Sequence, residues 1–173
     1  MKKILIINPF GIGDVIFSTP LIEILKSSLP GCFIGYICNR RVSGLIKTNP
    51  FLNKIFVYEK DDYREIWKCS RVKCLVKIFS FLKSIKKEKF DISIDLSLGY
   101  QYSMLFAVIG IKKRIGFDYR DRGRFLTDKV GIESFDDKHV VQYYLDVLRL
   151  LDIDVSKDVI SPKIYASEES LSF

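Results

Sequence analysis

The opening segment, residues 2–26, constrains the fold more than any other part of this chain. An apolar run at residues 4–7 ends at an Asn-Pro pair, and Gly11 and Gly13 then precede Asp14, where a new apolar periodicity begins. That order predicts a buried strand, a tight loop and a helix. A loop of this kind brings free backbone N–H groups and one carboxylate to the carboxyl edge of a parallel sheet, where α/β proteins bind their ligands. We therefore expect the functional site to begin here.

Length and composition predict one soluble domain. The chain has 173 residues, of which 48% are hydrophobic and 28% are charged, which is typical of a folded globular domain. The first apolar run is interrupted too early for a signal peptide. The apolar stretch Met104 to Ile111 is too short to span a membrane. We expect a cytoplasmic protein.

Strand-like and helix-like segments alternate along the whole chain. The pattern predicts strands at Lys3–Ile7, Phe33–Cys38, Lys54–Tyr58, Ile92–Leu96 and Arg114–Phe117. It predicts helices at Val15–Leu29, Arg41–Thr48, Arg64–Lys87, Tyr100–Ile109 and His139–Leu151. Parallel neighbours need crossover connections, so this order favours the α/β class, with a Rossmann-like doubly wound parallel sheet.

The cysteines and the single histidine do not form a recognisable metal site. Cys69 and Cys74 are five residues apart, and His139 is distant from both, so the spacing of a zinc site is absent. We expect all four cysteines to be reduced and to act mainly as small buried hydrophobic residues. His139 opens the last predicted helix, and we interpret it as a helix-end or packing residue. No metal and no resident cofactor are expected.

Most of the net charge of +7 comes from one segment. Residues 60–89 contain ten basic and four acidic side chains. Within this segment, apolar residues at helical spacing, from Val72 to Ile85, lie opposite Lys73, Lys77 and Lys87, which predicts an amphipathic helix with a basic face. A basic face is usually only solvated. The alternative is peripheral contact between the basic helix, residues 64–87, and an anionic surface such as phospholipid headgroups or a phosphorylated glycolipid. No motif indicates nucleic-acid binding.

The first loop fails the common nucleotide-binding motifs. Ile16 stands where a dinucleotide-binding motif has its third glycine, and no Lys-Ser/Thr pair follows as in a P-loop. The two glycines allow a ligand to approach the backbone closely. A carboxylate in the first helical turn interacts favourably with the helix dipole and can accept a proton from a sugar hydroxyl. Asp14 is equally interpretable as a residue that only caps the helix.

Four segments together resemble the N-terminal half of family 9 glycosyltransferases, the lipopolysaccharide heptosyltransferase family. They are ILIINPFGIGDVIFSTPLIEILK, KFDISIDLS, KRIGFDYRDRGRFLTDKV and KHVVQYYLDVLRLLDI, in that order. The resemblance implies a two-domain GT-B architecture, in which this Rossmann-like half binds the acceptor and a second half binds the nucleotide-activated sugar. It implies a donor such as ADP-heptose as co-substrate and a glycolipid or glycan acceptor.

The resemblance also assigns roles to individual residues. Asp14 matches the aspartate taken as the base that deprotonates the acceptor hydroxyl, with inversion at the sugar and without a metal. Four neighbouring residues, Gly11, Gly13, Ser18 and Thr19, match the acceptor-side loop and first helical turns. Arg120, Arg122 and Arg124 resemble the basic residues used near acidic acceptor groups, a role that suits guanidinium; a simple charged loop explains them equally well.

The chain departs from the family at two points. Ser97-Leu98-Gly99 stands where many relatives have glutamine or histidine before glycine, so Ser97 is the candidate acceptor-binding residue there. Residues 161–165 resemble an edge strand, and Ser167-Glu168-Glu169 resembles a helix start with little chain left to continue it. We interpret residues 1–160 as the acceptor-side domain and residues 161–173 as the start of an interdomain segment whose second domain is absent. We therefore expect a fragment, a truncated gene or an isolated domain.

Three functional hypotheses follow. In the first, the intact parent is a cytoplasmic glycosyltransferase, acting at the inner face of the inner membrane, that transfers a heptose-like sugar to a lipopolysaccharide-core or related acceptor. In the second, the 173-residue chain is a catalytically inactive, stand-alone acceptor-binding half-domain. In the third, it is an unrelated Rossmann-like binder of a small molecule that shares only the architecture.

Overall fold

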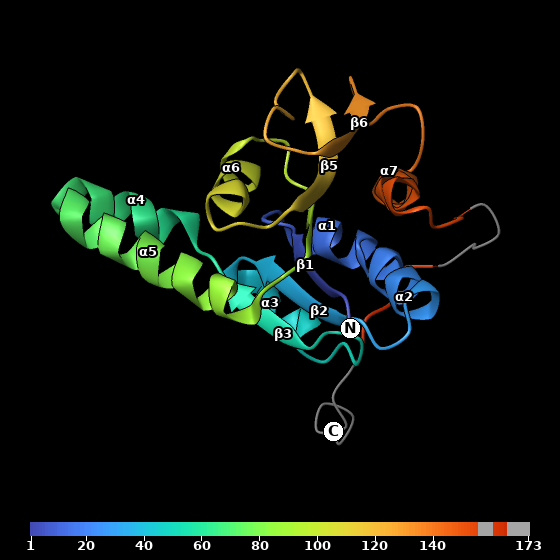
Figure 1. Cartoon of the computed structure of the whole chain (residues 1–173), viewed down its shortest axis with the longest axis horizontal. Helices are drawn as coiled ribbons and strands as arrows, with labels where there is room; N and C mark the ends of the chain where they lie inside the picture. Colours follow the sequence, from blue (N-terminus) through green and yellow to red (C-terminus); the bar gives the residue numbers. More distant parts are fainter. Residues whose placement is uncertain (156–160, 166–173) are drawn as a thin grey trace.

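A computed structural model of the chain describes residues 1–155 and 161–165. Within these residues, one six-stranded sheet has the strand order β3-β2-β1-β4-β5-β6, and every neighbouring pair is parallel (Figure 1). The strands are β1 (Lys3–Ile7), β2 (Phe33–Cys38), β3 (Lys54–Val57), β4 (Ile92–Asp95), β5 (Lys113–Tyr119) and β6 (Asp128–Ile132). The predicted doubly wound parallel sheet is confirmed.

The sixth strand was not predicted. β6 alternates half-buried and exposed residues, and it includes the charged Asp128 and Lys129 together with Gly131. It therefore lacks the continuous apolar run that marks the buried strands β1 and β2. Its conformation comes from pairing with β5, because Ile115 through Tyr119 align with all five of its residues.

Three of the five predicted helices are divided: two form pairs of α-helices, and the last forms an α-helix followed by a 3₁₀ helix. The helices are α1 (Ile12–Phe17), α2 (Thr19–Ser28), α3 (Arg40–Ile46), α4 (Lys60–Cys69), α5 (Arg71–Glu88), α6 (Gln101–Val108) and α7 (Val140–Asp146), followed by the 3₁₀ helix η1 (Val147–Leu151). Pro20 cannot continue the hydrogen-bond ladder of α1, so a new helix starts at Thr19. Ser70 is extended, and its hydroxyl accepts a hydrogen bond from the Lys73 N–H at 3.3 Å, which caps α5 and separates it from α4.

The helices cover both faces of the sheet and form two cores. Ile4 and Ile6 of β1 face α1, α2, α3 and α7, whereas Leu5 and Ile7 face α5 and α6. This alternation follows from the two-residue period of a strand. Because both faces of β1 are covered, four consecutive residues of the strand are fully buried.

The orientation of α5 differs from the prediction. The residues of α5 that turn toward the protein are Cys74, Phe81 and Ile85. Most of the apolar stripe that was expected to be buried, including Val72 and Phe79, is exposed instead. The helix is amphipathic as predicted, but the sheet and α4 pack against a different side of it.

The last described segment also corrects a prediction. Residues 161–165 do not form an edge strand. They lie across α2 and α3, where the Lys163 N–H donates to Thr19 Oγ1 at 3.0 Å and the Tyr165 hydroxyl donates to Glu23 at 2.7 Å. These bonds connect the segment to side chains rather than to a strand edge. The helix start predicted at Ser167 lies outside the described residues.

Three smaller predictions can be compared with the structure. All four cysteines are free, and Cys69 is the only one that is exposed. Burial raises the pKa of Cys38 to about 12, which keeps that thiol protonated. His139 is the N-cap of α7, where its Nδ1 accepts a hydrogen bond from the Val141 N–H at 3.3 Å, as expected for a helix-end residue. No helix among the described residues is both long enough and apolar enough to cross a membrane.

Candidate functional site

The strand order reverses between the loops that follow β1 and β4, and open α/β sheets generally have a ligand-binding crevice at such a point. The crossover from β1 leads to β2 on one side, and β4 pairs with β1 on the other side. Ile7 lies beside Asp95 at the end of these two strands. A reversal of strand order at this position is where open α/β sheets bind ligands. The predicted site loop and the Ser97 loop therefore leave neighbouring strands at the same edge of the sheet.

Two asparagines shape the loop after β1. The buried Asn8 donates from Nδ2 to the Asp14 carbonyl at 3.0 Å, and its Oδ1 accepts from the Phe10 N–H at 3.2 Å. Asn39, at the end of β2, donates to the Phe10 carbonyl at 2.7 Å. The Phe10 N–H, the Phe10 carbonyl and the Asp14 carbonyl thus each bond to an asparagine side chain, which fixes the path of the loop. Sequence reasoning treated both asparagines only as chain punctuation.

The two glycines leave the edge of the crevice uncovered. Gly11 is the N-cap of α1, and both Gly11 and Gly13 are exposed. Neither has a positive φ, and an added Cβ would lie 3.9 Å from Asp14 Oδ2 at Gly11 and 4.0 Å from the Phe17 ring at Gly13. The backbone could therefore accept alanine at both positions. What glycine provides here is open space beside the Asp14 carboxylate.

Asp14 lies in the first turn of α1 and is half-buried. Its neighbour on the inner side is Tyr144 of α7. Burial raises the pKa of Tyr144, and the charge of Asp14 together with a hydrogen bond to it raises this pKa further. The Tyr144 hydroxyl therefore stays neutral and supports the Asp14 carboxylate from the inner side. Gly11 and Gly13, which have no side chains, leave the outer side of this carboxylate accessible.

Ser18 and Thr19 have structural partners instead of open access. Ser18 is fully buried, and its hydroxyl donates to the Val15 carbonyl and shares a 2.7 Å hydrogen bond with Tyr36. Thr19 donates to the Ile16 carbonyl at 2.8 Å and accepts from the Lys163 N–H. In this conformation neither hydroxyl reaches the crevice, so an acceptor-binding role for either residue stays a prediction that the geometry does not favour.

Asp95 is a buried carboxyl group that sequence reasoning did not select. It ends β4, and its Oδ1 accepts from the Ser97 N–H at 3.0 Å, whereas Oδ2 has no hydrogen-bond partner among the described residues. Burial raises the pKa of Asp95 to about 7, and hydrogen bonds from Ser97 and Ser103 limit the rise. Ser97 itself is buried, and its hydroxyl donates to the Gly99 carbonyl. Asp95 therefore orders the turn in which Ser97 lies.

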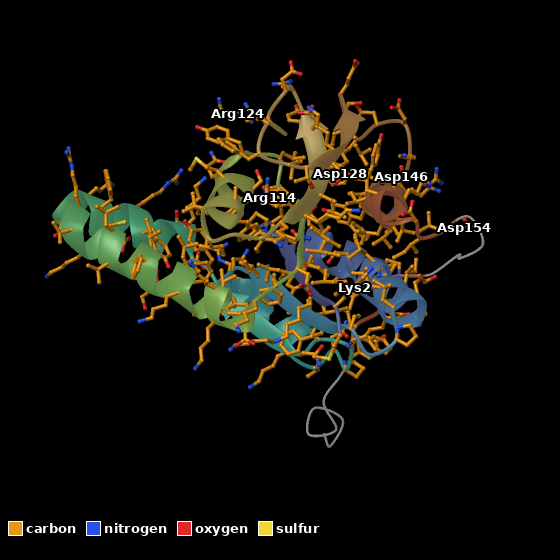
Figure 2. All side chains as sticks on the ribbon, viewed as in Figure 1. Lys2, Arg114, Arg124, Asp128, Asp146 and Asp154 are labelled. Carbon is orange, nitrogen blue, oxygen red and sulfur yellow. The ribbon has the colours of Figure 1, made fainter. Side chains whose placement is uncertain are left out.

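The basic loop after β5 contains one arginine that reaches back toward the crevice. Arg120 and Arg122 are exposed. The Arg124 guanidinium lies over the Tyr100 ring, 4.5 Å from its centroid, and so connects this loop to the one after β4. Figure 2 shows Arg124 beside α6, whereas Arg114 lies deeper and donates to the Phe125 and Ile111 carbonyls. The contacts of Arg124 place it better than Arg120 or Arg122 for binding across the two loops.

A pocket of about 250 Å³ lies at the same edge, toward β3. Its lining comes from the residues that follow β1, β2 and β3 and from α3, α4 and α6, and it includes Pro9, Asn39, Arg41, Tyr58, Lys60 and Tyr102. A cavity of about 680 Å³ lies at the opposite end of the sheet, where β4 and β5 begin. The smaller pocket adjoins the candidate site, so it is the more relevant of the two for a ligand that approaches Asp14.

Comparison with known proteins decides the family. Residues 78–173 match the model of glycosyltransferase family 9 (heptosyltransferase), which is more than half of the chain. The chain belongs to glycosyltransferase family 9. The match begins after the Asp14 loop, so it carries the family membership but not the role of that loop. The predicted family is thereby confirmed.

Individual family 9 proteins resemble this chain over about half of their own length. Lipopolysaccharide heptosyltransferase 3 of Escherichia coli is 22% identical over 144 residues, which cover 82% of this chain and 41% of that protein. The structure of a family 9 glycosyltransferase from Veillonella parvula DSM 2008 has a TM-score of 0.74 at 22% identity and covers 97% of this chain and 46% of its own.

A second solved structure agrees with this. E. coli heptosyltransferase WaaC with ADP-2-deoxy-2-fluoro heptose has a TM-score of 0.77 at 16% identity, and the alignment covers 95% of this chain and 52% of WaaC. These structures share the fold of this chain over about half of their own length. This chain spans less than half the length of the curated relative that it matches.

Proposed function

We propose that this family 9 chain is the acceptor-side half of a sugar transferase with a heptose-like donor. The supporting observation is the position of Asp14, a half-exposed carboxylate in the first turn of α1, bordered by two bare glycines at the reversal of strand order. Its relatives include proteins named lipopolysaccharide heptosyltransferase. We infer a nucleotide-activated heptose such as ADP-heptose as donor and a lipopolysaccharide-core or related glycan as acceptor.

The proposed step is a single displacement with inversion. An acceptor hydroxyl attacks the anomeric carbon, the bond from that carbon to the diphosphate oxygen breaks, and the nucleoside diphosphate leaves with the electron pair. Asp14 accepts the hydroxyl proton as the new glycosidic bond forms. Asn8 and Asn39 hold the loop that carries this carboxylate, and Tyr144 supports it from the inner side. The exposed Gly11 and Gly13 admit the acceptor.

The second candidate is a stand-alone acceptor-binding half. The chain corresponds to 41% of the curated relative that it matches. We expect the 173-residue chain alone to show no transfer when it is mixed with ADP-heptose and glycolipid acceptor, because the donor would bind to the other half of the enzyme. Turnover by the isolated chain would contradict this division of roles.

The catalytic role of Asp14 is tested in an assembled enzyme that contains this half. Asp14→Asn keeps the size of the side chain and removes the base, so we expect kcat to fall about 10²–10⁴-fold with a smaller change in KM. Asp152→Asn is a matched control, because Asp152 is an exposed aspartate in a left-handed conformation that asparagine also adopts. Near-normal transfer by Asp14→Asn would remove Asp14 from the mechanism and leave it as a helix-terminal residue.

A further inference from the structure

The first half of α5 carries large apolar side chains that no other described residue covers. Val72, Leu75, Val76 and Phe79 are between 56% and 71% exposed. They repeat at helical spacing, so they share one side of the helix. Trp67 on the neighbouring α4 is also 48% exposed. Apolar side chains gathered in this way mark an interaction site more often than scattered ones do.

The helix pair that carries these residues extends away from the sheet. α4 starts just after the carboxyl end of β3, and α5 returns toward the start of β4. The first half of α5 packs on α4, where Cys74 Sγ donates to the Tyr63 carbonyl and Lys77 pairs with Asp62 at 3.3 Å. The second half, through Ile85, packs on the sheet. Figure 1 shows the α4–α5 pair as an arm that projects beyond the rest of the molecule.

The same side of α5 becomes basic in its second half. Lys83, Lys86 and Lys87 continue the line that begins at Val72 and Phe79, because they follow at intervals of three or four residues. Lys87 was expected on the opposite side of the helix, and this corrects that expectation. We call this surface the α5 outer face; it consists of Val72, Leu75, Val76, Phe79, Lys83, Lys86 and Lys87. It contains no acidic residue.

The acidic residues near the α5 outer face are engaged elsewhere. Asp62 pairs with Arg40 and Lys77, and Glu88 pairs with Lys54. Within the part of the chain that the structure describes, Lys83, Lys86 and Lys87 have no ion-pair partner. Their charge is therefore available to an external anion.

A cavity beside these lysines has matching chemistry. The cavity of about 680 Å³ beside them is lined by Lys83, Lys86, Lys87, Lys89 and Lys112, by the apolar Ile85, Phe90, Ile109 and Ile111, and by one acidic residue, Asp91, whose Oδ2 accepts a hydrogen bond from the Lys3 N–H at 2.8 Å. An apolar hollow ringed by lysines suits a molecule with a hydrocarbon part and an anionic head. It does not suit a polar sugar, which would leave the apolar walls without a partner.

We propose that the α5 outer face docks on an anionic phospholipid bilayer. Its apolar half enters the interface between headgroups and acyl chains, and its basic half contacts lipid phosphates, the combination by which surface-bound helices associate with membranes. Charge complementarity favours a lipid surface over a second copy of this chain, because two such basic faces would repel each other. The proposal stands apart from sugar transfer.

The test measures binding of the 173-residue chain to vesicles that contain neither glycan acceptor nor sugar donor. Vesicles of phosphatidylcholine with a minority of phosphatidylglycerol are compared with vesicles of phosphatidylcholine alone. We expect co-sedimentation with the anionic vesicles only, weakened by added salt. Trp67 is the only tryptophan in the sequence, so we also expect its emission to shift to shorter wavelength on binding. Equal binding to neutral vesicles, or no binding to either, would overturn the proposal.

Paired variants separate the two halves of the face. Val76→Ser with Phe79→Ser should reduce binding about tenfold or more, whereas Ile164→Ser, an exposed apolar residue on the α2 side of the sheet, should not. Lys83→Ala with Lys86→Ala and Lys87→Ala should also weaken binding about tenfold or more, and the same loss of charge at Lys2, Lys47 and Arg149 should have much less effect. Circular dichroism verifies that each variant is folded.

Two results with the variants would contradict the docking surface. Unchanged vesicle binding by both α5 variants would place the lipid contact elsewhere on the chain. A lipid-free dimer seen by analytical ultracentrifugation and abolished by Val76→Ser with Phe79→Ser would show that the face binds a second copy of the chain instead. Because no transfer is measured, neither result depends on whether the proposed function is correct.

Discussion

Gly13 shows how one residue can serve a function at the cost of stability. It occupies the second position of α1 and is exposed, and an added Cβ there would lie 4.0 Å from the Phe17 ring. Glycine is a poor residue within a helix because it loses more backbone freedom on folding than other residues do. The local sequence is therefore suited to the access of a ligand rather than to the strongest helix.

We predict that Gly13→Ala stabilises the fold and impairs transfer. The free energy of unfolding should rise by about 0.5–1 kcal/mol, because alanine fits without a close contact. In an assembled enzyme, the added methyl group should raise KM for the acceptor. Gly44→Ala in α3 is the matched control, since a Cβ there meets nothing within 4 Å; it should give the same stabilisation with unchanged kinetics. Transfer by Gly13→Ala at the normal KM would show that the acceptor does not approach this edge.

Asp95 should make the free energy of unfolding depend on pH. Its pKa is raised to about 7 by burial, so between about pH 4 and pH 7 the folded state holds more protons than the unfolded state. The free energy of unfolding should therefore fall as pH rises through this range, by at most about 1.4 kcal/mol per pH unit. Asp95→Asn should remove that slope, and Asp152→Asn should keep it. Urea denaturation at several pH values measures both; equal slopes in all three proteins would mean that Asp95 does not titrate in this range.

At the scale of elements, short side chains at the ends of strands and helices determine the site. Asn39 accepts from the Val42 N–H at 3.2 Å to cap α3 and also donates to the Phe10 carbonyl in the loop after β1. Ser70 caps α5 in a similar way but has no link to the site. Comparing the two caps therefore separates the effect of losing a helix cap from the effect of loosening the loop that carries Asp14.

We predict different consequences for the loss of these caps. Asn39→Ala and Ser70→Ala should each lower the free energy of unfolding by about 1 kcal/mol, with the larger loss at Asn39, which makes two hydrogen bonds. Only Asn39→Ala should also reduce transfer, because it frees the Phe10 carbonyl and loosens the loop that holds Asp14. Thermal unfolding and steady-state kinetics of the assembled enzyme measure the two effects. Equal kinetics for both variants would show that the loop keeps its geometry without Asn39.

The central strands β1 and β2 could be predicted from the sequence, whereas the edge strand β6 and the buried side of α5 could not. Residues 3–7 and 33–38 were placed with the observed bounds, because continuous apolar runs indicate strands buried on both faces. β6 was missed because pairing with β5, rather than its own composition, makes it a strand. The buried side of α5 was also mispredicted, because α5 has apolar residues on more of its surface than the sheet and α4 cover. Helical spacing cannot tell which apolar side meets the protein.

The candidate site was predicted only in part, because the sequence shows local backbone requirements but not contacts between distant segments. The loop of Gly11, Gly13 and Asp14 was located because local backbone requirements are visible in sequence. Asp95 and Tyr144 were not selected, because they matter only through neighbours that the fold brings together: Ser97 for one and Asp14 for the other. Arg124, grouped before with Arg120 and Arg122, is distinguished by its contact with Tyr100.

At the scale of the whole molecule, residues 161–165 hold the end of the described chain against α2 and α3. Tyr165 donates to Glu23 and packs against Phe51, and Lys163 pairs with Glu23 at 2.9 Å. Burial and the adjacent Glu23 raise the pKa of Tyr165 to about 12. The segment therefore adds contacts between parts of the chain more than a hundred residues apart.

We predict that Tyr165→Phe lowers the free energy of unfolding by about 0.5–1.5 kcal/mol through loss of the hydrogen bond to Glu23. In the wild type, the contribution of this tyrosine should be complete below pH 10 and be lost between about pH 10 and pH 12, because its folded pKa lies above its ordinary value. Tyr119→Phe serves as control, because the Tyr119 hydroxyl forms no hydrogen bond with any residue of 1–155 or 161–165. Urea denaturation at pH 7 compares the variants; no difference between them would mean that the segment detaches freely.

The position of β1 at the centre of the sheet has a consequence for biosynthesis. β1 pairs with β2 on one side and with β4 on the other, and residues 58–91 separate β3 from β4 along the chain. On the ribosome, β1, β2 and β3 can assemble while the other edge of β1 is still open. At a translation rate of roughly 5–20 residues per second, that edge waits about 2–7 s for β4 to be synthesised. During this interval the nascent chain exposes an apolar strand edge, so we expect chaperone demand to be highest when the ribosome is translating the α4–α5 arm.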